Sequence, residues 1–214
     1  HYVRGLFQSM RNLATHNLRR LRRNLKTVPA ETAPLAEHIL TLEGEILQRY
    51  RRLTELRIHA RRIRIHGDYH LRQILWTGKD FVILNLEGET TASLSERRIK
   101  RSPLRDVAGM IRSFHGAAEA GLVRHVERGS LPPENLARFE PWARFWQHAV
   151  GTAFLRAYLQ ALEPSDLLPR TPDELHALLQ AYLLHHALQE LGRELIHRPA
   201  WLRVPLKGIL QLLA

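Results

Sequence analysis

The chain has 214 residues and 44% hydrophobic residues, which is enough for a buried core and excludes an intrinsically disordered protein. It contains no cysteine, so disulfides and thiol chemistry are excluded, and its net charge of +11 favours anionic ligands. No apolar run reaches the ~18–20 residues of a membrane span, and no signal peptide is evident, so we expect a cytoplasmic protein without a membrane partner.

The first quarter of the chain is expected to be helical. Helices are predicted over residues 1–26 and 33–60, because apolar residues recur at roughly helical spacing. The segment 28–32 contains a proline and separates the two helices. Residues 63–65 (Ile-Arg-Ile) then alternate in the manner of a short strand.

A β-hairpin is expected in the middle of the chain. Residues 73–76 and 81–84 are apolar runs, and Thr-Gly-Lys-Asp at 77–80 joins them. A turn of this length with a glycine between two apolar runs is a good hairpin signal.

The remainder of the chain is predicted to be helical, beginning with residues 104–125 and 141–162, where Pro141 suits a first-turn position. Trp142 and Trp146 lie four residues apart and therefore share a helix face. We expect them in a buried core stripe; an aromatic wall that stacks on a sugar is the alternative.

The last long helix is expected to start at a capping box formed by Thr171 and Glu174 and to end near His197. The predicted fold class is therefore mainly α with one small β-hairpin.

Arginine and lysine cluster in three runs, at residues 19–23, 61–64 and 97–101. A solvated arginine-rich face is the plain interpretation, and an anion-binding surface is the alternative. Neither interleaved aromatic residues nor a nucleic-acid motif accompanies these runs, so nucleic acid is not an expected partner.

Two polar clusters have the residue types that phosphoryl transfer needs. That reaction uses a carboxylate to accept the proton of the attacking hydroxyl, and oxygen ligands that hold Mg²⁺ on the nucleotide phosphates. Asp68 supplies a carboxylate, and Gln73 follows five residues later, as Asn follows Asp in the protein-kinase catalytic loop. Asn85 and Glu87, after the hairpin, are candidates for a second metal cluster.

Other assignments of these residues remain open. The pattern His66-Gly-Asp68-Tyr-His70 offers zinc ligands at alternate positions, but no third cluster supports a zinc site. We expect His66 and His70 to be structural, with His66 bracing the loop through hydrogen bonds. Arg105 and Asp106 are expected to form an intrahelical or loop-bracing pair.

The chain closely resembles the bacterial maltokinases, which are often fused to trehalose synthase. The resemblance is carried by His-Gly-Asp-Tyr-His-Leu-Arg-Gln at 66–73, Val-Ile-Leu-Asn-Leu-Glu-Gly-Glu at 82–89, the segment 94–110 and the C-terminal segment 198–209. It implies the C-terminal lobe of a two-lobed, protein-kinase-like (aminoglycoside-phosphotransferase-like) fold. The N-lobe is expected to lie outside this chain, since no glycine-rich phosphate loop and no strand-borne lysine precede Asp68.

The resemblance also implies a function in trehalose and α-glucan metabolism. ATP and Mg²⁺ would be used to convert maltose to maltose 1-phosphate, with Asp68 as the catalytic base and Gln73, Asn85 and Glu87 facing the metal. The expected partners are the sugar, the nucleotide, the N-lobe and a fused trehalose synthase module. A single domain, 1–214, would comprise a helical lead-in (1–60), the catalytic loop and metal hairpin (61–101) and a helical sugar-side subdomain (102–214).

Three features depart from the family pattern. Asn85 stands where the family has Asp, and Arg72 where it usually has Gly. On the sugar-facing helix the family's Lys and two Tyr are replaced; the candidate substrate-binding residues there are His186, Gln189, Glu190, Arg193 and Glu194. The alternative to a sugar kinase is therefore a degenerate kinase module that binds trehalose synthase without transferring phosphate.

Overall fold

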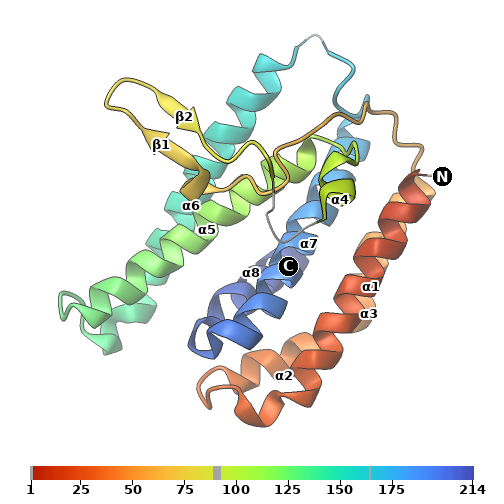
Figure 1. The fold of residues 1–214 in the computed structure, drawn as a ribbon. Helices are drawn as coiled ribbons and strands as arrows, with labels where there is room; N and C mark the ends of the chain where they lie inside the picture. Colours follow the sequence, from red (N-terminus) through yellow and green to blue (C-terminus); the bar gives the residue numbers. More distant parts are fainter. Residues whose placement is uncertain (1, 89–92, 164) are drawn as a thin grey trace. The chain divides into compact units, whose positions relative to one another are not determined.

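The computed structural model describes residues 2–88, 93–163 and 165–214. Helices dominate these residues, and two short strands form the one sheet among them (Figure 1). The chain divides into two compact units: His1–Ala60 with Pro169–Ala214, and Arg61–Leu168. No helix among the described residues is both long and apolar enough to cross a bilayer.

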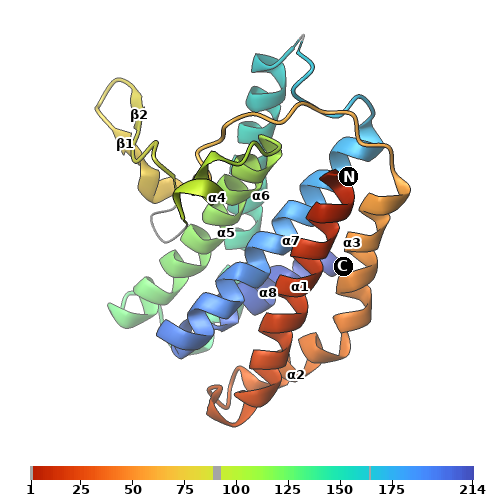
Figure 2. The same ribbon diagram turned by 45° about the vertical axis from the view of Figure 1, so that its right-hand side comes forward.

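The described residues of the first unit form five α-helices, which are α1 (Tyr2–Arg23), α2 (Ala33–Thr41), α3 (Glu43–Glu55), α7 (Pro172–His197) and α8 (Arg203–Leu213). Helix α7 packs against α1, α3 and α8, and Figure 2 shows α1 and α7 running side by side. Helix α7 is buried over much of its circumference, because neighbours cover several of its sides.

A glycine sets the close approach of α1 and α7. A Cβ atom added to Gly192 would lie 2.5 Å from Nδ2 of Asn17. That buried amide donates a hydrogen bond to the carbonyl oxygen of Leu188 at 2.8 Å. The missing side chain at Gly192 therefore leaves space for a buried polar contact between the two helices.

The helix boundaries in this unit differ from the sequence prediction in two places. The segment predicted as one helix over 33–60 forms two helices, α2 and α3, and the second ends at Glu55. The division falls at Leu42, where the backbone leaves helical geometry and the N–H of Leu42 bonds to the carbonyl oxygen of Ile39, three residues back. At the start of α7, Oγ1 of Thr171 accepts from the N–H of Glu174 at 3.2 Å, as the predicted cap requires. The Glu174 carboxylate accepts instead from the backbone N–H of His59.

The described residues of the second unit form the hairpin, with strands β1 (Ile74–Trp76) and β2 (Phe81–Ile83), and three α-helices, which are α4 (Leu94–Arg98), α5 (Leu104–Glu127) and α6 (Leu136–Ala161). The strands pair antiparallel, with Ile74 opposite Ile83 and Trp76 opposite Phe81, so the predicted hairpin is confirmed. Helices α5 and α6 pack along each other (Figure 1). The predicted strand at 63–65 is wrong: Ile63 forms a single bridge with Arg101.

Helix α6 differs most from its prediction. It begins at Leu136, so Pro141 lies inside the helix, where its missing N–H removes one backbone hydrogen bond. The predicted core stripe is wrong, because Trp142 is 69% exposed and Trp146 is 45% exposed. Gly151 is the buried residue of this helix, and at 100° per residue Trp142 lies on the side opposite to it.

Candidate active site

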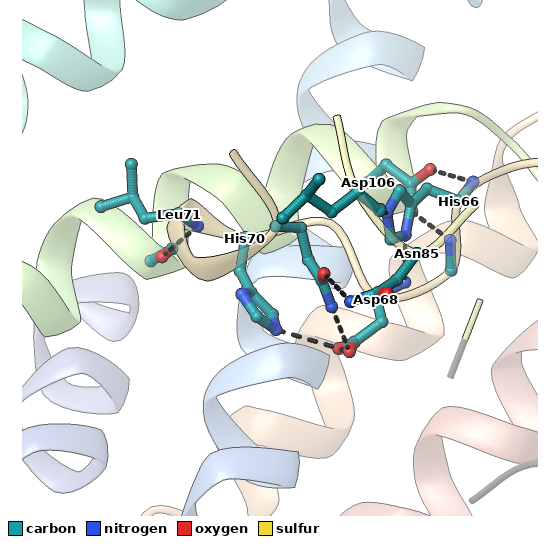
Figure 3. A network of polar contacts seen from close by, with 10 residues as sticks. His66, Asp68, His70, Leu71, Asn85 and Asp106 are labelled. Atoms are coloured by element: carbon teal, nitrogen blue, oxygen red, sulfur yellow. Dashed lines mark hydrogen bonds and ion pairs between the residues drawn. The ribbon is translucent and has the colours of Figure 1, made fainter. Parts of the chain in front are cut away.

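The loop that carries Asp68 is fixed to helix α5 at two points. The carboxylate of Asp106 accepts hydrogen bonds from the backbone N–H groups of His66 (2.7 Å) and Gly67 (2.9 Å). Oγ of Ser113 accepts from the N–H of Leu71 at 2.9 Å (Figure 3). Asp106 and Ser113 are seven residues apart and share one face of α5, so a single rigid helix holds both ends of the loop.

His66 connects the loop to the end of the hairpin. Its Nε2 lies 2.8 Å from the carbonyl oxygen of Leu84, and its Nδ1 lies 3.3 Å from the backbone nitrogen of Asp68. A carbonyl only accepts, so Nε2 carries the proton and Nδ1 accepts the N–H of Asp68. These two bonds together require the neutral Nε2–H tautomer, and they are the contacts expected of a bracing residue.

The carboxylate of Asp68 is partly exposed and anchored by two donors. Its side chain is 38% exposed, and Oδ2 lies 3.4 Å from Nε2 of His70 and 3.3 Å from Nε2 of Gln73. The hydrogen bond from His70 is the largest influence on the pKa of Asp68; partial burial opposes it, and Gln73 adds to it. The net effect lowers the pKa, so Asp68 is ionised and can accept a proton from a bound hydroxyl.

Gln73 and Asn85 continue this row of hydrogen bonds. Gln73 is buried, and its Oε1 accepts from Nδ2 of Asn85 at 2.7 Å (Figure 3). Asn85 follows β2 with a φ of 53°, in the left-handed region that Asn tolerates better than most residues. Its carbonyl oxygen accepts the N–H of Gly88, which closes a turn over residues 85–88.

Two arginines from separate basic runs stabilise that turn. Arg64 donates to the carbonyl oxygen of Leu86, and Arg97 donates to that of Glu87, each at 3.4 Å. The side chain of Glu87 is exposed. Glu89, the other acid of the motif, lies outside the described residues. The basic runs therefore contribute structure here as well as surface charge.

A hydrogen-bonded pair, Gln73 and Asn85, occupies the place of the predicted magnesium ligands. Mg²⁺ takes oxygen ligands in near-octahedral geometry, with carboxylates as its usual protein ligands. Oε1 of Gln73 already accepts from Asn85, which presents an N–H donor rather than an oxygen to Gln73. Within the described ranges, no three His, Asp or Glu side chains are grouped to hold a metal ion.

Helix α5 contributes functional contacts that the sequence only partly indicated. Asp106 braces the loop; an intrahelical pair with Arg105 was the other role predicted for it. Burial raises the pKa of Asp106, while the two backbone N–H groups lower it and burial prevails. Ser113 was not predicted, and its spacing of seven residues from Asp106 is the only sequence signal for it.

The five candidate substrate-binding residues lie on α7, in the other unit from the Asp68 loop. Three of them (His186, Gln189 and Glu190) are partly buried, and Arg193 is exposed. The Glu194 carboxylate is buried and binds Arg198 through both oxygens, at 2.7 and 2.8 Å. The contacts of Glu194 support a structural role, and substrate binding by this group stays a prediction.

No protein-family model matches the chain. The chain is 33% identical over 141 residues to a glucosamine kinase from Mycolicibacterium smegmatis. The matched segment covers 65% of this chain and 32% of that protein. A glucosamine kinase structure (crystal form B) covers 99% of this chain and 46% of its own, with 23% identity and a TM-score of 0.75. Another, in complex with glucosamine, ADP and inorganic phosphate, covers 99% and 45%, with 23% identity and a TM-score of 0.76.

The chain thus spans less than half the length of the relatives it matches. The structural matches show that it has the fold of that part of a glucosamine kinase. The sequence match supports a relationship to the sugar kinases.

Proposed function

We propose that this chain is part of a sugar kinase, in which it supplies the catalytic base and part of the acceptor site. The observation that carries the proposal is Asp68, an ionised and partly exposed carboxylate in a loop fixed by α5. The similarity to glucosamine kinases supports ATP as the phosphoryl donor, since one of the matching structures contains ADP. In a two-lobed kinase fold this chain would be the C-terminal lobe, and an N-lobe would cover the nucleotide.

The proposed step needs one base and one acceptor hydroxyl. Asp68 takes the proton of a sugar hydroxyl while that oxygen bonds to the γ-phosphorus of ATP, and the bond to the β–γ bridging oxygen breaks. The products are the sugar phosphate and ADP. His70 and Gln73 keep Asp68 ionised and oriented. No step is assigned to magnesium, because Gln73 and Asn85 hydrogen-bond to each other.

The acceptor that the comparisons favour is glucosamine, which the relatives' names specify. Maltose, which the motif resemblance implies, is the alternative. We infer an amino sugar because the sequence match is to a glucosamine kinase and because the Lys-Tyr-Tyr pattern of the maltokinase sugar helix is replaced on α7.

The test is sugar-dependent ADP release by the full-length protein with ATP and Mg²⁺, using glucosamine, maltose or no sugar. Release with glucosamine above the other two is expected; release with maltose alone would assign the maltokinase specificity instead. Asp80→Asn, the same chemical change in the exposed hairpin turn, should retain activity, since Asn suits turns. Asp68→Asn should lose at least about a hundredfold in turnover.

A second candidate function is that of a degenerate kinase module that binds trehalose synthase without phosphoryl transfer. It is favoured by the hydrogen bond between Gln73 and Asn85, two residues that were expected to be metal ligands. It predicts no sugar-dependent ADP release by the parent protein and co-elution of the full-length protein with trehalose synthase in size-exclusion chromatography.

A further inference from the structure

The three side chains beside the candidate base form a directional row. Nδ2 of Asn85 donates to Oε1 of Gln73 at 2.7 Å, and Nε2 of Gln73 donates to Oδ2 of Asp68 at 3.3 Å. An ionised carboxylate only accepts hydrogen bonds, so Asp68 requires the nitrogen of Gln73 on its side. The oxygen of Gln73 then faces Asn85, which must present its own nitrogen.

We propose, building on the sugar-kinase function above, that Asn85 is a positioning residue that takes the place of a divalent cation. Its amide nitrogen supplies the positive end that Oε1 of Gln73 needs, and so keeps Gln73 directed at Asp68. The Asp68 loop is then complete without a metal bound between residues 73 and 85.

A carboxylate at position 85 would behave in the opposite way. It has no donor for Oε1 of Gln73, so two oxygens would face each other there. Turning the Gln73 amide around would place its oxygen against Asp68 instead. Gln73 is 8% exposed and has little solvent to turn towards. A cation between the oxygens would relieve either arrangement, because oxygen ligands are what hard divalent cations bind.

The backbone builds this pairing into the end of the hairpin. The carbonyl oxygen of Gln73 accepts the N–H of Leu84 at 2.8 Å, one step beyond the paired strands. The left-handed conformation of Asn85 and its hydrogen bond from Gly88 then set the start of the turn. The two amide side chains are therefore brought together by backbone contacts on both segments.

The charge at position 85 also bears on cation binding. Arg64 and Arg97 donate to the carbonyl oxygens of Leu86 and Glu87 in the turn that begins at Asn85. Hard divalent cations favour carboxylate ligands, and the neutral Asn85 offers none. A carboxylate at position 85 would add one negative charge next to Gln73 and so favour a cation there.

The experiment compares the full-length parent protein with Asn85→Asp, measuring Mn²⁺ uptake by electron paramagnetic resonance and the melting temperature with and without Mg²⁺, in the absence of nucleotide. The parent should show no Mg²⁺-dependent shift. Without metal, Asn85→Asp should melt at a lower temperature than the parent, and Mg²⁺ should restore the parent's melting temperature. This variant should also take up one more Mn²⁺ per chain than the parent. Gln147→Glu, the same amide-to-acid change on α6, should behave as the parent.

Equal Mn²⁺ uptake by the parent and Asn85→Asp would overturn the proposal. Should Asn85→Asp fail to fold, the parent and Asn85→Ala decide the matter. Equal Mn²⁺ uptake by the parent and Asn85→Ala supports the proposal. Lower uptake by Asn85→Ala than by the parent would show that Asn85 is a metal ligand, and would overturn it. Neither readout requires sugar turnover, so a protein without kinase activity can still support or contradict the role of Asn85.

Discussion

Oδ2 of Asp106 lies 2.7 Å from the backbone nitrogen of His66. The other oxygen of the same carboxylate accepts from Gly67 at 2.9 Å. The acid in the first turn of α5 thus satisfies two backbone donors of the candidate catalytic loop, and it does so from a partly buried position. Asp106 therefore aligns the loop on which Asp68 depends.

Asp106→Asn should loosen this loop. An amide can accept from only one of the two backbone donors and presents its own N–H₂ to the other, at a cost of about 1–3 kcal/mol. Hydrogen exchange at the amides of His66 and Gly67 should become faster. In the matched variant Ser113→Ala, the amide of Leu71 should exchange faster while those of His66 and Gly67 keep their protection. Unchanged exchange in Asp106→Asn would contradict the bracing role.

The pH dependence of activity should report the environment of Asp68. Its pKa is lowered, with the hydrogen bond from His70 as the largest cause, so the base stays ionised to a pH below the usual Asp range. The acidic limb of kcat/KM should therefore lie below the ordinary pKa of Asp. In His70→Ala that limb should move to higher pH, because the main donor to the carboxylate is removed. A limb that stays in place would exclude His70 as that donor.

Gly88 should be intolerant of a side chain. Its φ is +83°, and a Cβ atom would lie 2.8 Å from the carbonyl oxygen of His66, a backbone atom in the loop itself. Gly78, in the hairpin turn, has a similar φ of +92° but open space around its Cβ position. Both alanine variants carry backbone strain of about 1–3 kcal/mol, and only Gly88→Ala adds a clash.

Melting temperatures and kcat/KM of the two glycine variants separate these effects. Gly88→Ala should lower the melting temperature more than Gly78→Ala and should also reduce kcat/KM. Equal losses in the two variants would mean that the close approach to His66 has no energetic importance.

The pair of Glu194 and Arg198 should stabilise the first unit. The carboxylate is 8% exposed and its bonds to Arg198 raise the pKa of that guanidinium. Glu194→Gln keeps the size but removes the charge, and it should destabilise the protein by about 1–3 kcal/mol in chemical denaturation. Arg198→Lys keeps the charge but loses the two-pronged geometry, so it should destabilise the protein by less than Glu194→Gln does. A neutral effect of Glu194→Gln would free this residue for the sugar-binding role.

Much of the architecture was predictable because its signals are local. The hairpin was marked by two apolar runs around a glycine-containing turn, and helix α5 by its helical pattern. The start of α7 followed from the cap at Thr171. These features depend on neighbouring residues, so a single sequence contains the information that specifies them.

The failures arose where distant contacts decide the outcome. Trp142 and Trp146 have the spacing of a core stripe, yet the side of α6 that faces α5 is the one that includes Gly151. The motif placed Asn85 among metal ligands, whereas its bond to Gln73 depends on side-chain orientations twelve residues apart. Ser113 is recognisable only once α5 lies along the loop.

The most direct measurement is phosphorus-31 NMR of the full-length protein incubated with ATP, Mg²⁺ and glucosamine, run in parallel with Asp68→Asn. The account predicts a new phosphomonoester resonance together with ADP in the parent sample, and its loss by at least about a hundredfold in the variant. A phosphomonoester formed equally fast by Asp68→Asn would contradict the assignment of Asp68 as the base. No phosphomonoester in the parent with either glucosamine or maltose would contradict the sugar-kinase function itself.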